Sequence, residues 1–192
     1  MDTNNKAKYI IFSAPSGSGK TTLVQEMMKK GLPLEFSISA TSRGPRKNEI
    51  HAKDYYFLTE EGFKQKVLAQ EFVEWEEVYH GTCYGTLKSE LDRITALGHI
   101  PVFDLDVIGG LNLKKILGDQ ALAIFVQVSD IDVLQQRLRS RATDSDESIQ
   151  KRLDKAAYEM SFASQFDTII INDDLSKAIN QSYDILKQFI NG

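Results

Sequence analysis

A glycine-rich loop lies between an apolar run and an amphipathic segment near the start of the chain. Residues 9–12, Tyr-Ile-Ile-Phe, lead into Ala14–Thr21, which reads Ala-Pro-Ser-Gly-Ser-Gly-Lys-Thr. A short buried strand, a glycine loop ending in Lys-Thr and a helix, in this order, are typical of the phosphate-binding loop (P-loop) of nucleoside triphosphate sites. The loop therefore predicts a strand–loop–helix unit, with phosphate bound where the helix begins.

The loop residues have separate chemical roles. Gly17 and Gly19 let backbone N–H groups close around phosphate oxygens, and the helix N-terminus adds partial positive charge. Lys20 can reach the β- and γ-phosphates, and Thr21 can offer its hydroxyl to Mg²⁺. Ala14 stands where the motif usually has a glycine, so this position must tolerate a Cβ and a negative φ. The alternative is a small-residue turn that caps a helix, which the ordered strand, glycines and Lys-Thr disfavour.

The composition disfavours several classes of protein. At 192 residues and 42% hydrophobic residues, the chain suits one domain with inserted subdomains. The net charge of −4 disfavours non-specific nucleic-acid binding, which usually needs a basic excess. Cys83 is the single cysteine, so no internal disulfide forms, and no apolar stretch approaches the ~20 residues of a membrane span. We expect a cytoplasmic protein with small-molecule substrates, no nucleic-acid partner and no membrane contact.

Strand-like and helix-like segments alternate over most of the chain, as in an α/β fold with a parallel sheet. The expected strands are residues 9–13, 100–106, 121–128 and 168–172. The expected helices include residues 20–29 and 175–190. This pattern predicts a core of four parallel strands with helical crossovers.

The middle of the chain, from about residue 33 to residue 86, has a different pattern. Apolar and polar residues alternate in short segments, and aromatic residues cluster near glycines. One helix is expected there, with Thr59 as its N-cap. We interpret this region as a mixed antiparallel insertion. A smaller polar insertion, Ser140–Glu147, lies between two expected helices.

Two carboxylates end the expected strand 100–106. Asp104 and Asp106 lie where ligands bind in open α/β sheets, and residues two apart share one face of a regular strand. Beside a P-loop they can hold Mg²⁺ through water or contact a substrate. Alone, they could equally cap the turn that follows.

Two groups of arginines stand out in this acidic chain. Arg43 and Arg46 flank Gly-Pro, and two close guanidinium groups suit a dianionic phosphate, although a solvated loop is the alternative. Arg137 and Arg141 share a helix face, and Arg152 lies on the next expected helix. Two helices presenting arginines across a polar loop predict a lid over phosphates, with a salt-bridged helix pair as the alternative.

The middle insertion also holds residues suited to a purine nucleotide. A carboxylate such as Glu74 can accept two hydrogen bonds from the N1–H and amino edge of guanine, which adenine lacks. Tyr55 and Tyr84 can offer hydroxyls to phosphate while their rings pack. Taken one by one, each of these residues is more often structural.

Taken together, these segments resemble the guanylate kinase family, P-loop enzymes of purine nucleotide metabolism that phosphorylate GMP with ATP. The resemblance covers nearly the whole chain, from about residue 8 to the C-terminal helix. The motifs that carry it are Ala14–Thr22, Ser39–Arg46, Lys53–Phe57, Phe72–Trp75, Tyr84–Thr86, Asp104–Asp106, Arg137 to Arg152 and Ile171–Asp174.

The resemblance implies a role for each matching residue. It implies ATP binding by Ala14, Pro15, Ser16, Gly17, Ser18, Gly19, Lys20, Thr21 and Thr22, with Arg137 and Asn172 near the adenine. It implies guanine recognition by Ser39, Glu74, Thr86 and Asp106, and binding of the GMP phosphate by Arg43, Arg46, Tyr55 and Tyr84. The implied catalytic residues are Lys20, Arg141 and Arg152. Mg²⁺ would be held by Thr21 and, through water, by Asp104.

The resemblance also implies an architecture and a reaction. One guanylate-kinase-like domain is expected, with a P-loop NTPase core at about 8–35, 87–136 and 153–192, a GMP-binding subdomain at about 36–86 and a lid at about 137–152. The implied reaction is direct transfer from ATP to GMP, with dGMP as a further acceptor, in a monomer or homodimer. One departure is the stretch before Tyr84, which is one residue longer than expected.

Two other functions remain open at this point. One is a related kinase with another acceptor, such as AMP or UMP. The other is a non-catalytic guanylate-kinase-like module that binds phosphorylated peptides. Such modules typically lose the P-loop lysine and the lid arginines, whereas Lys20, Arg141 and Arg152 are present here.

Overall fold

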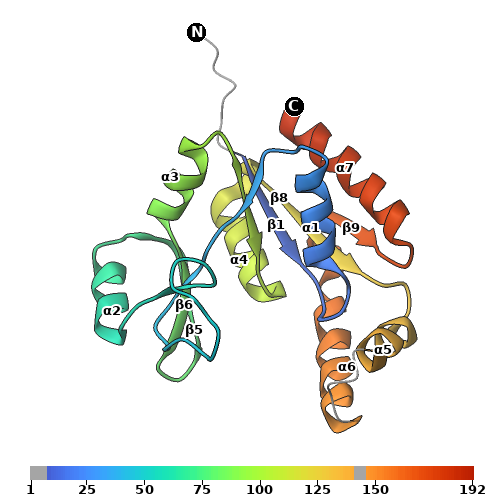
Figure 1. Cartoon of the computed structure of the whole chain (residues 1–192), viewed down its shortest axis with the longest axis horizontal. Coiled ribbons are helices and arrows are strands. Elements are labelled where there is room, and N and C mark those ends of the chain that lie inside the picture. Colours follow the sequence, from blue (N-terminus) through green and yellow to red (C-terminus); the bar gives the residue numbers. More distant parts are fainter. Residues whose placement is uncertain (1–7, 141–145) are drawn as a thin grey trace. The chain divides into compact units, whose positions relative to one another are not determined.

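The computed structural model describes residues 8–140 and 146–192. The chain forms two compact units (Figure 1). The first unit contains the chain up to Leu34 together with Val102–Gly192, and the second unit is Glu35–Pro101. The second unit takes in a helix beyond the expected insertion at 36–86, and the assignment of that insertion to GMP stays a prediction.

The larger sheet has five strands in the described part of the chain, in the order β2-β7-β1-β8-β9. Its strands are β1 (Tyr9–Ser13), β2 (Leu34–Phe36), β7 (Ile100–Asp104), β8 (Ala121–Gln127) and β9 (Thr168–Ile171). Strand β1 pairs in parallel with β7 and β8, and β8 pairs in parallel with β9. The predicted parallel sheet is therefore confirmed, but the expected number of four strands is wrong. The additional strand β2 has only three residues, too few to show a strand period.

Several helices accompany this sheet in the described part of the first unit. They are α1 (Lys20–Lys29), α4 (Val107–Leu117), α5 (Ile131–Ser140), α6 (Asp146–Met160) and α7 (Leu175–Asn191). Helix α1 buries Leu23, Val24 and Met27 and lies beside α7 (Figure 1). None of the helices within 8–140 or 146–192 combines the length and apolar composition that a membrane span requires.

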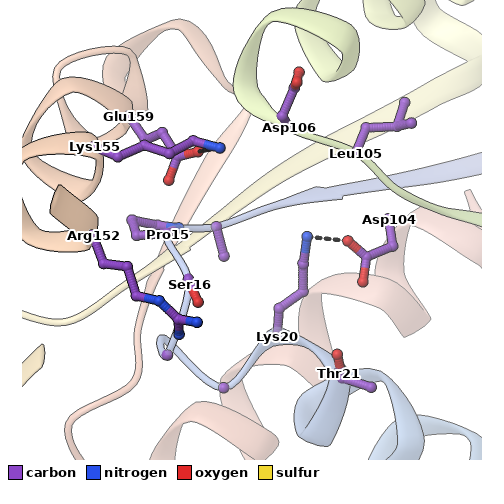
Figure 2. Close-up of a pocket in the computed structure, with 13 residues that line it drawn as sticks. Pro15, Ser16, Lys20, Thr21, Asp104, Leu105, Asp106, Arg152, Lys155 and Glu159 are labelled. Atoms are coloured by element: carbon purple, nitrogen blue, oxygen red, sulfur yellow. Dashed lines mark ion pairs between the residues drawn. The ribbon is translucent and has the colours of Figure 1, made fainter. Parts of the chain in front are cut away.

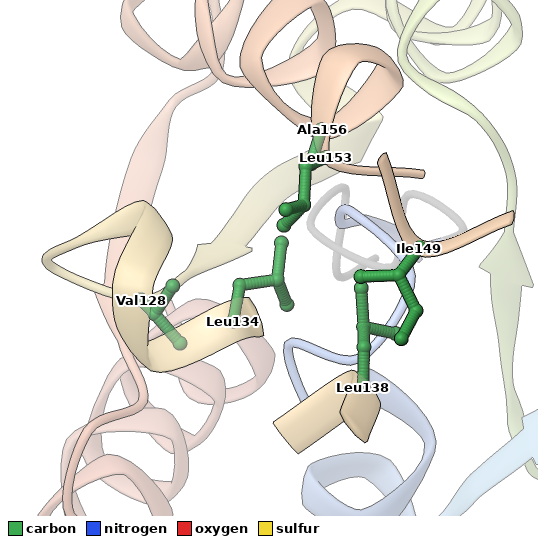
Figure 3. Close-up of a cluster of buried hydrophobic side chains, with 6 residues drawn as sticks. All are labelled: Val128, Leu134, Leu138, Ile149, Leu153 and Ala156. Carbon is green, nitrogen blue, oxygen red and sulfur yellow. The ribbon is translucent and has the colours of Figure 1, made fainter. Parts of the chain in front are cut away.

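Helices α5 and α6 pack together through an apolar cluster (Figure 3). The cluster is formed by Val128, Leu134, Leu138, Ile149, Leu153 and Ala156. The Leu134 and Leu138 side chains also reach the P-loop, where a Cβ added at Gly17 would lie 3.0 Å and 3.3 Å from their methyl carbons. Gly17 has a φ of +97°, so both its backbone and its surroundings favour glycine. Helix α5 thus supports one side of the P-loop.

The second unit contains a four-stranded mixed sheet in the order β4-β3-β6-β5. Its elements are β3 (Ala40–Thr41), β4 (Tyr56–Phe57), α2 (Glu60–Leu68), β5 (Phe72–Tyr79), β6 (Thr82–Leu87) and α3 (Lys88–Ala96). Strand β6 pairs antiparallel with β3 and β5, while β3 and β4 are parallel, as the mixed insertion predicted. Thr59 caps α2 as expected, because its hydroxyl accepts the Gly62 N–H at 3.0 Å. The β5–β6 pairing has register shifts between Phe72 and Glu74 and between Glu77 and Tyr79.

Candidate functional site

The P-loop joins β1 to α1 in a conformation that only its glycines adopt readily. Gly17 and Gly19 have φ of +97° and +89°, and Gly19 is the N-cap of α1. No side-chain hydrogen bond caps α1 in the described part of the chain, so the N–H groups of its first turn favour an anion there. Among the described residues, positive φ outside glycine occurs only at Asn48, Ala52 and Gln70. Ala14 is not among them, so its backbone has the negative φ that an alanine at this position of the motif requires.

The P-loop forms one wall of a cavity of about 410 Å³ in the first unit (Figure 2). The predicted loop residues line it, except Ser18, which is buried, and Thr22. Its other lining residues come from the end of β7 and the residues after it (Asp104, Leu105 and Asp106), and from α6 (Arg152, Lys155 and Glu159). One cavity thus combines glycine backbone, cationic side chains and carboxylates.

The two carboxylates after β7 have different partners. Asp104 forms an ion pair with Lys20, drawn as a dashed line in Figure 2. Asp106 caps α4, because its Oδ1 accepts the Gly109 N–H at 2.8 Å. The expected strand 100–106 therefore ends two residues early, at Asp104, and the two carboxylates do not share a strand face. Asp106 therefore has the capping role that the sequence left open as an alternative. Asp104 instead lies beside Lys20, the lysine that binds phosphate in P-loop motifs.

Helix α6 directs three charged residues into the cavity (Figure 2). Arg152, Lys155 and Glu159 are three and four residues apart, so they share one helix face. Glu159 is only 6% exposed, and its carboxylate lies 3.6 Å from the Lys155 ammonium. Burial raises the pKa of Glu159, and Lys155 opposes this shift. No sequence motif indicates Lys155 or Glu159 as site residues, although their spacing from Arg152 places them on the same face of α6.

The other predicted lid and adenine residues have distinct positions. Arg141 lies outside the described residues. Arg137 donates from Nη2 to the backbone carbonyls of Asn172 and Asp173, at 2.7 Å and 3.3 Å. Asn172 follows β9 with its side chain buried, and its amide reaches the P-loop. Arg137 thus contacts the β9–α7 connection.

In the second unit, Arg43 lies at the centre of a compact polar cluster. Its Nε donates to the Tyr84 hydroxyl at 3.1 Å, and its guanidinium lies over the Tyr55 ring at 5.0 Å from the centroid. Three predicted phosphate-binding residues are therefore brought together. Arg46, the fourth residue predicted to bind the phosphate, is exposed, and its backbone N–H donates to Glu49 at 2.7 Å.

Glu49 is a residue of this cluster that the sequence did not indicate. Its two carboxylate oxygens accept from Nη1 and Nη2 of Arg43 at 2.6 Å and 2.9 Å, which is a bidentate pair. The Arg43 hydrogen bonds and the Arg46 N–H hold the pKa of Glu49 down at about 2. The same pairing raises the pKa of Arg43. Glu49 thereby fixes the guanidinium plane of Arg43 and the loop that carries Arg46.

We expect Arg43→Met to return the pKa of Glu49 from about 2 towards its ordinary value of 4.5. Because the folded-state pKa lies below the unfolded one, this contribution to stability is fully present above pH 4.5 and is lost as pH falls towards 2. A ¹³C NMR titration of the glutamate carboxyl groups measures the shift. Arg46→Met is the matched control, since it keeps the backbone N–H and should leave most of the shift. An unchanged midpoint in Arg43→Met would contradict the pairing.

Glu74 and Thr86 face each other across the β5–β6 hairpin. The two residues are in register, and the Thr86 hydroxyl donates to Glu74 Oε1 at 2.7 Å. Thr86 is 1% exposed, so this hydroxyl fixes a carboxylate oxygen from inside the unit. Tyr84 lies two residues before Thr86 on β6 and hence on the same face. The second unit therefore presents a carboxylate, a hydroxyl and the Arg43 cluster along neighbouring strands.

A buried glutamate holds the segment that carries Ser39. Glu90 on α3 is 1% exposed and accepts hydrogen bonds from Ile38 N at 2.9 Å and from the Tyr56 hydroxyl at 2.7 Å. The Ser39 carbonyl accepts from the Tyr56 N–H at 2.9 Å. Arg93 also pairs with Glu90, and these partners outweigh burial and lower its pKa. Ser39 thus lies in a restrained segment, while the fourth predicted guanine residue, Asp106, belongs to the first unit.

Comparison with known proteins decides among families that share this loop. The guanylate kinase family model matches residues 6–190. The chain belongs to the guanylate kinase family. A guanylate kinase of Bacteroides fragilis is 50% identical over 185 residues, which cover 96% of this chain and 91% of that protein. A guanylate kinase of Porphyromonas gingivalis is 48% identical over 184 residues, covering 95% of this chain and 98% of that protein.

Solved structures agree with this membership. The crystal structure of guanylate kinase from Anaplasma phagocytophilum matches with a TM-score of 0.67 and 26% identity, covering 95% of this chain and 85% of that chain. A shikimate kinase from Bacteroides thetaiotaomicron matches with a TM-score of 0.50 and 17% identity, covering 96% and 99%, which supports the fold alone. The predicted family, P-loop fold and enzyme class are confirmed.

Proposed function

We propose that the protein transfers the γ-phosphoryl group of ATP directly to the phosphate of GMP, forming ADP and GDP, and that it also accepts dGMP. The observation that carries this proposal is the P-loop cavity of a guanylate kinase family chain, with Lys20, Asp104 and Arg152 around it. The Glu74–Thr86 pair and the Arg43 cluster of the second unit support GMP as the acceptor.

On the donor side, the P-loop backbone and the start of α1 bind the triphosphate. Lys20 and Arg152 supply positive charge at the transferring phosphoryl group, and the predicted lid residue Arg141 adds to it. Lys155 adds a further cation at the same cavity. Their charges offset the negative charge of the phosphates during the transfer.

The donor side also suits a magnesium ion. The cavity offers a hydroxyl from Thr21 and a carboxylate from Asp104, both hard oxygen ligands. Within residues 8–140 and 146–192, no group of three or more His, Cys, Asp or Glu is arranged to hold a metal. This fits Mg²⁺, which keeps several waters and takes substrate phosphates as its other ligands. Bound there, it supplies charge neutralisation to the phosphates.

On the acceptor side, the second unit binds GMP through its base and its phosphate. Glu74 accepts hydrogen bonds from the guanine edge, and Thr86 and Ser39 complete the polar contacts with the base. Arg43, held by Glu49, binds the phosphate together with Tyr84 and the other predicted residues Arg46 and Tyr55. The first unit's Asp106 is the remaining proposed guanine contact.

The transfer needs neither a covalent enzyme intermediate nor a strong base. The acceptor oxygen of GMP is already anionic, so no proton has to be removed from it. Rate enhancement then comes from orienting the two phosphates in line and from stabilising their charge. We further propose a cytoplasmic location and a monomer or homodimer without nucleic-acid partners.

The test is a panel of acceptors with ATP as the donor. We expect ADP formation with GMP and dGMP, and at least tenfold lower kcat/KM with AMP and UMP, because only guanine donates two hydrogen bonds to Glu74. Coupled measurement of ADP release gives all four values under one condition. A preference for AMP or UMP would identify a related kinase with another acceptor. ATP binding without turnover on any acceptor would indicate a non-catalytic module.

A further inference from the structure

Asn172 is a buried polar residue held in place from both sides of its backbone. It follows β9 and is 3% exposed. Its N–H donates to the Gln127 carbonyl at 2.8 Å, and its carbonyl accepts from Arg137 at 2.7 Å. The position of the side chain is therefore fixed by β8 and α5. From there, Nδ2 donates to the Ser18 carbonyl at 2.6 Å in a fully buried hydrogen bond.

The P-loop passes directly against this side chain. Gly19 has a φ of +89°, and a Cβ added there would overlap the Asn172 Nδ2 atom. Gly19 is thus required by its backbone conformation and also by the closeness of Asn172. A residue that follows β9, 153 positions after Gly19, shapes the centre of the phosphate-binding loop.

The hydrogen bond to Ser18 determines the direction of the next N–H group. The Ser18 carbonyl and the Gly19 N–H belong to the same planar peptide, and in a trans peptide these two groups point in opposite directions. Because the carbonyl is held towards Asn172, the Gly19 N–H must point to the other side of the loop. Gly19 lines the triphosphate cavity, so its N–H is available to a phosphate oxygen there.

We propose that Asn172 is a positioning residue that holds the Ser18–Gly19 peptide so that the Gly19 N–H donates to the bound triphosphate. This inference rests on the proposed function only in requiring that the P-loop binds a triphosphate. It differs from the adenine contact expected from the resemblance. Asn172 Nδ2 is already bonded to Ser18, and Oδ1 is buried without a partner in the described part of the chain. Contact with a base would require the side chain to leave the P-loop.

Asn172→Asp tests the proposal with almost no change in side-chain size. It places a carboxylate oxygen against the Ser18 carbonyl, which repels the carbonyl and turns the peptide. Asn172→Ala removes the bond and leaves a buried carbonyl unsatisfied. We expect both variants to bind ATP about 10- to 100-fold more weakly, and inorganic tripolyphosphate by the same factor, as measured by calorimetry. The Kd for GMP should stay unchanged.

Controls separate this role from others. Asn180→Asp adds the same charge at an exposed position of α7 and should leave all three Kd values unchanged. ATP addition should shift the Gly19 amide resonance strongly in the unmodified protein and weakly in Asn172→Asp. Unchanged ATP binding in Asn172→Asp would overturn the proposal. Weaker ATP binding with unchanged tripolyphosphate binding would overturn it in favour of adenine contact, and an equal loss for GMP would indicate a general folding role. Failure of the unmodified protein to bind either triphosphate would instead refute the proposed function.

Discussion

Replacing Lys20 by alanine should lower kcat at least about 100-fold with the fold intact. Lys20 lies at the start of α1, and its side chain is only 15% exposed in the triphosphate cavity. It pairs there with Asp104, so its ammonium is held where phosphate charge develops during transfer. Removal of a preorganised charge from such a site typically costs two to three orders of magnitude in rate. The measurement is steady-state ADP formation at saturating ATP and GMP.

The control for this prediction is Lys29→Ala. Lys29 ends the same helix and pairs with Glu26 at 2.7 Å on the exposed surface, so its removal should leave kcat unchanged. The thermal midpoint of Lys20→Ala should stay close to that of the parent, because a partly exposed ion pair contributes about 1 kcal/mol or less. GMP binding, measured without ATP, should also be retained. If Lys20→Ala kept kcat within tenfold of the parent, Lys20 would not stabilise the transferring group.

The P-loop and the parallel core were predictable because their signals are local. A buried run, a glycine loop and an amphipathic helix follow one another within 9–29, and each has its own period or composition. The Thr59 cap was predictable for the same reason. Strand β2 was not, since a strand of three residues is too short to show a period. The predicted strand 100–106 was two residues too long, because an aspartate that caps a helix and one that ends a strand cannot be distinguished by sequence alone.

The contacts that orient the candidate site could not be predicted from spacing. Asn172 and Ser18 are 154 residues apart, and nothing in either segment indicates a bond between them. Glu49 pairs with Arg43 across an irregular loop, where no helical or strand period relates residues six apart. By contrast, Lys155 lies three residues after Arg152 on α6, and this helical spacing is a local signal that predicts a shared face. Motifs identified which residue types bind phosphate, while the residues that orient them come from tertiary packing.

Glu74→Gln should weaken GMP selectively. The Thr86 hydroxyl donates to Glu74 Oε1 at 2.7 Å, which orients the carboxylate on the β5–β6 hairpin. A carboxylate only accepts hydrogen bonds, whereas glutamine also presents an NH₂ donor. Guanine offers two donors to this position, its N1–H and its amino group. In the variant, the glutamine NH₂ group would therefore face a donor of the base. We expect kcat/KM for GMP to fall about 10- to 100-fold.

The decisive readout is the ratio of kcat/KM for GMP to that for AMP. Adenine has an acceptor at N1, to which the glutamine NH₂ can donate, so AMP should lose little and the ratio should fall. The KM for ATP should not change, because the P-loop cavity belongs to the first unit. Glu61→Gln on α2 makes the same chemical change at an exposed position of the second unit and should leave the ratio unaltered. An equal loss of kcat/KM for GMP and AMP in Glu74→Gln would mean that Glu74 stabilises the hairpin through Thr86 and does not recognise the base.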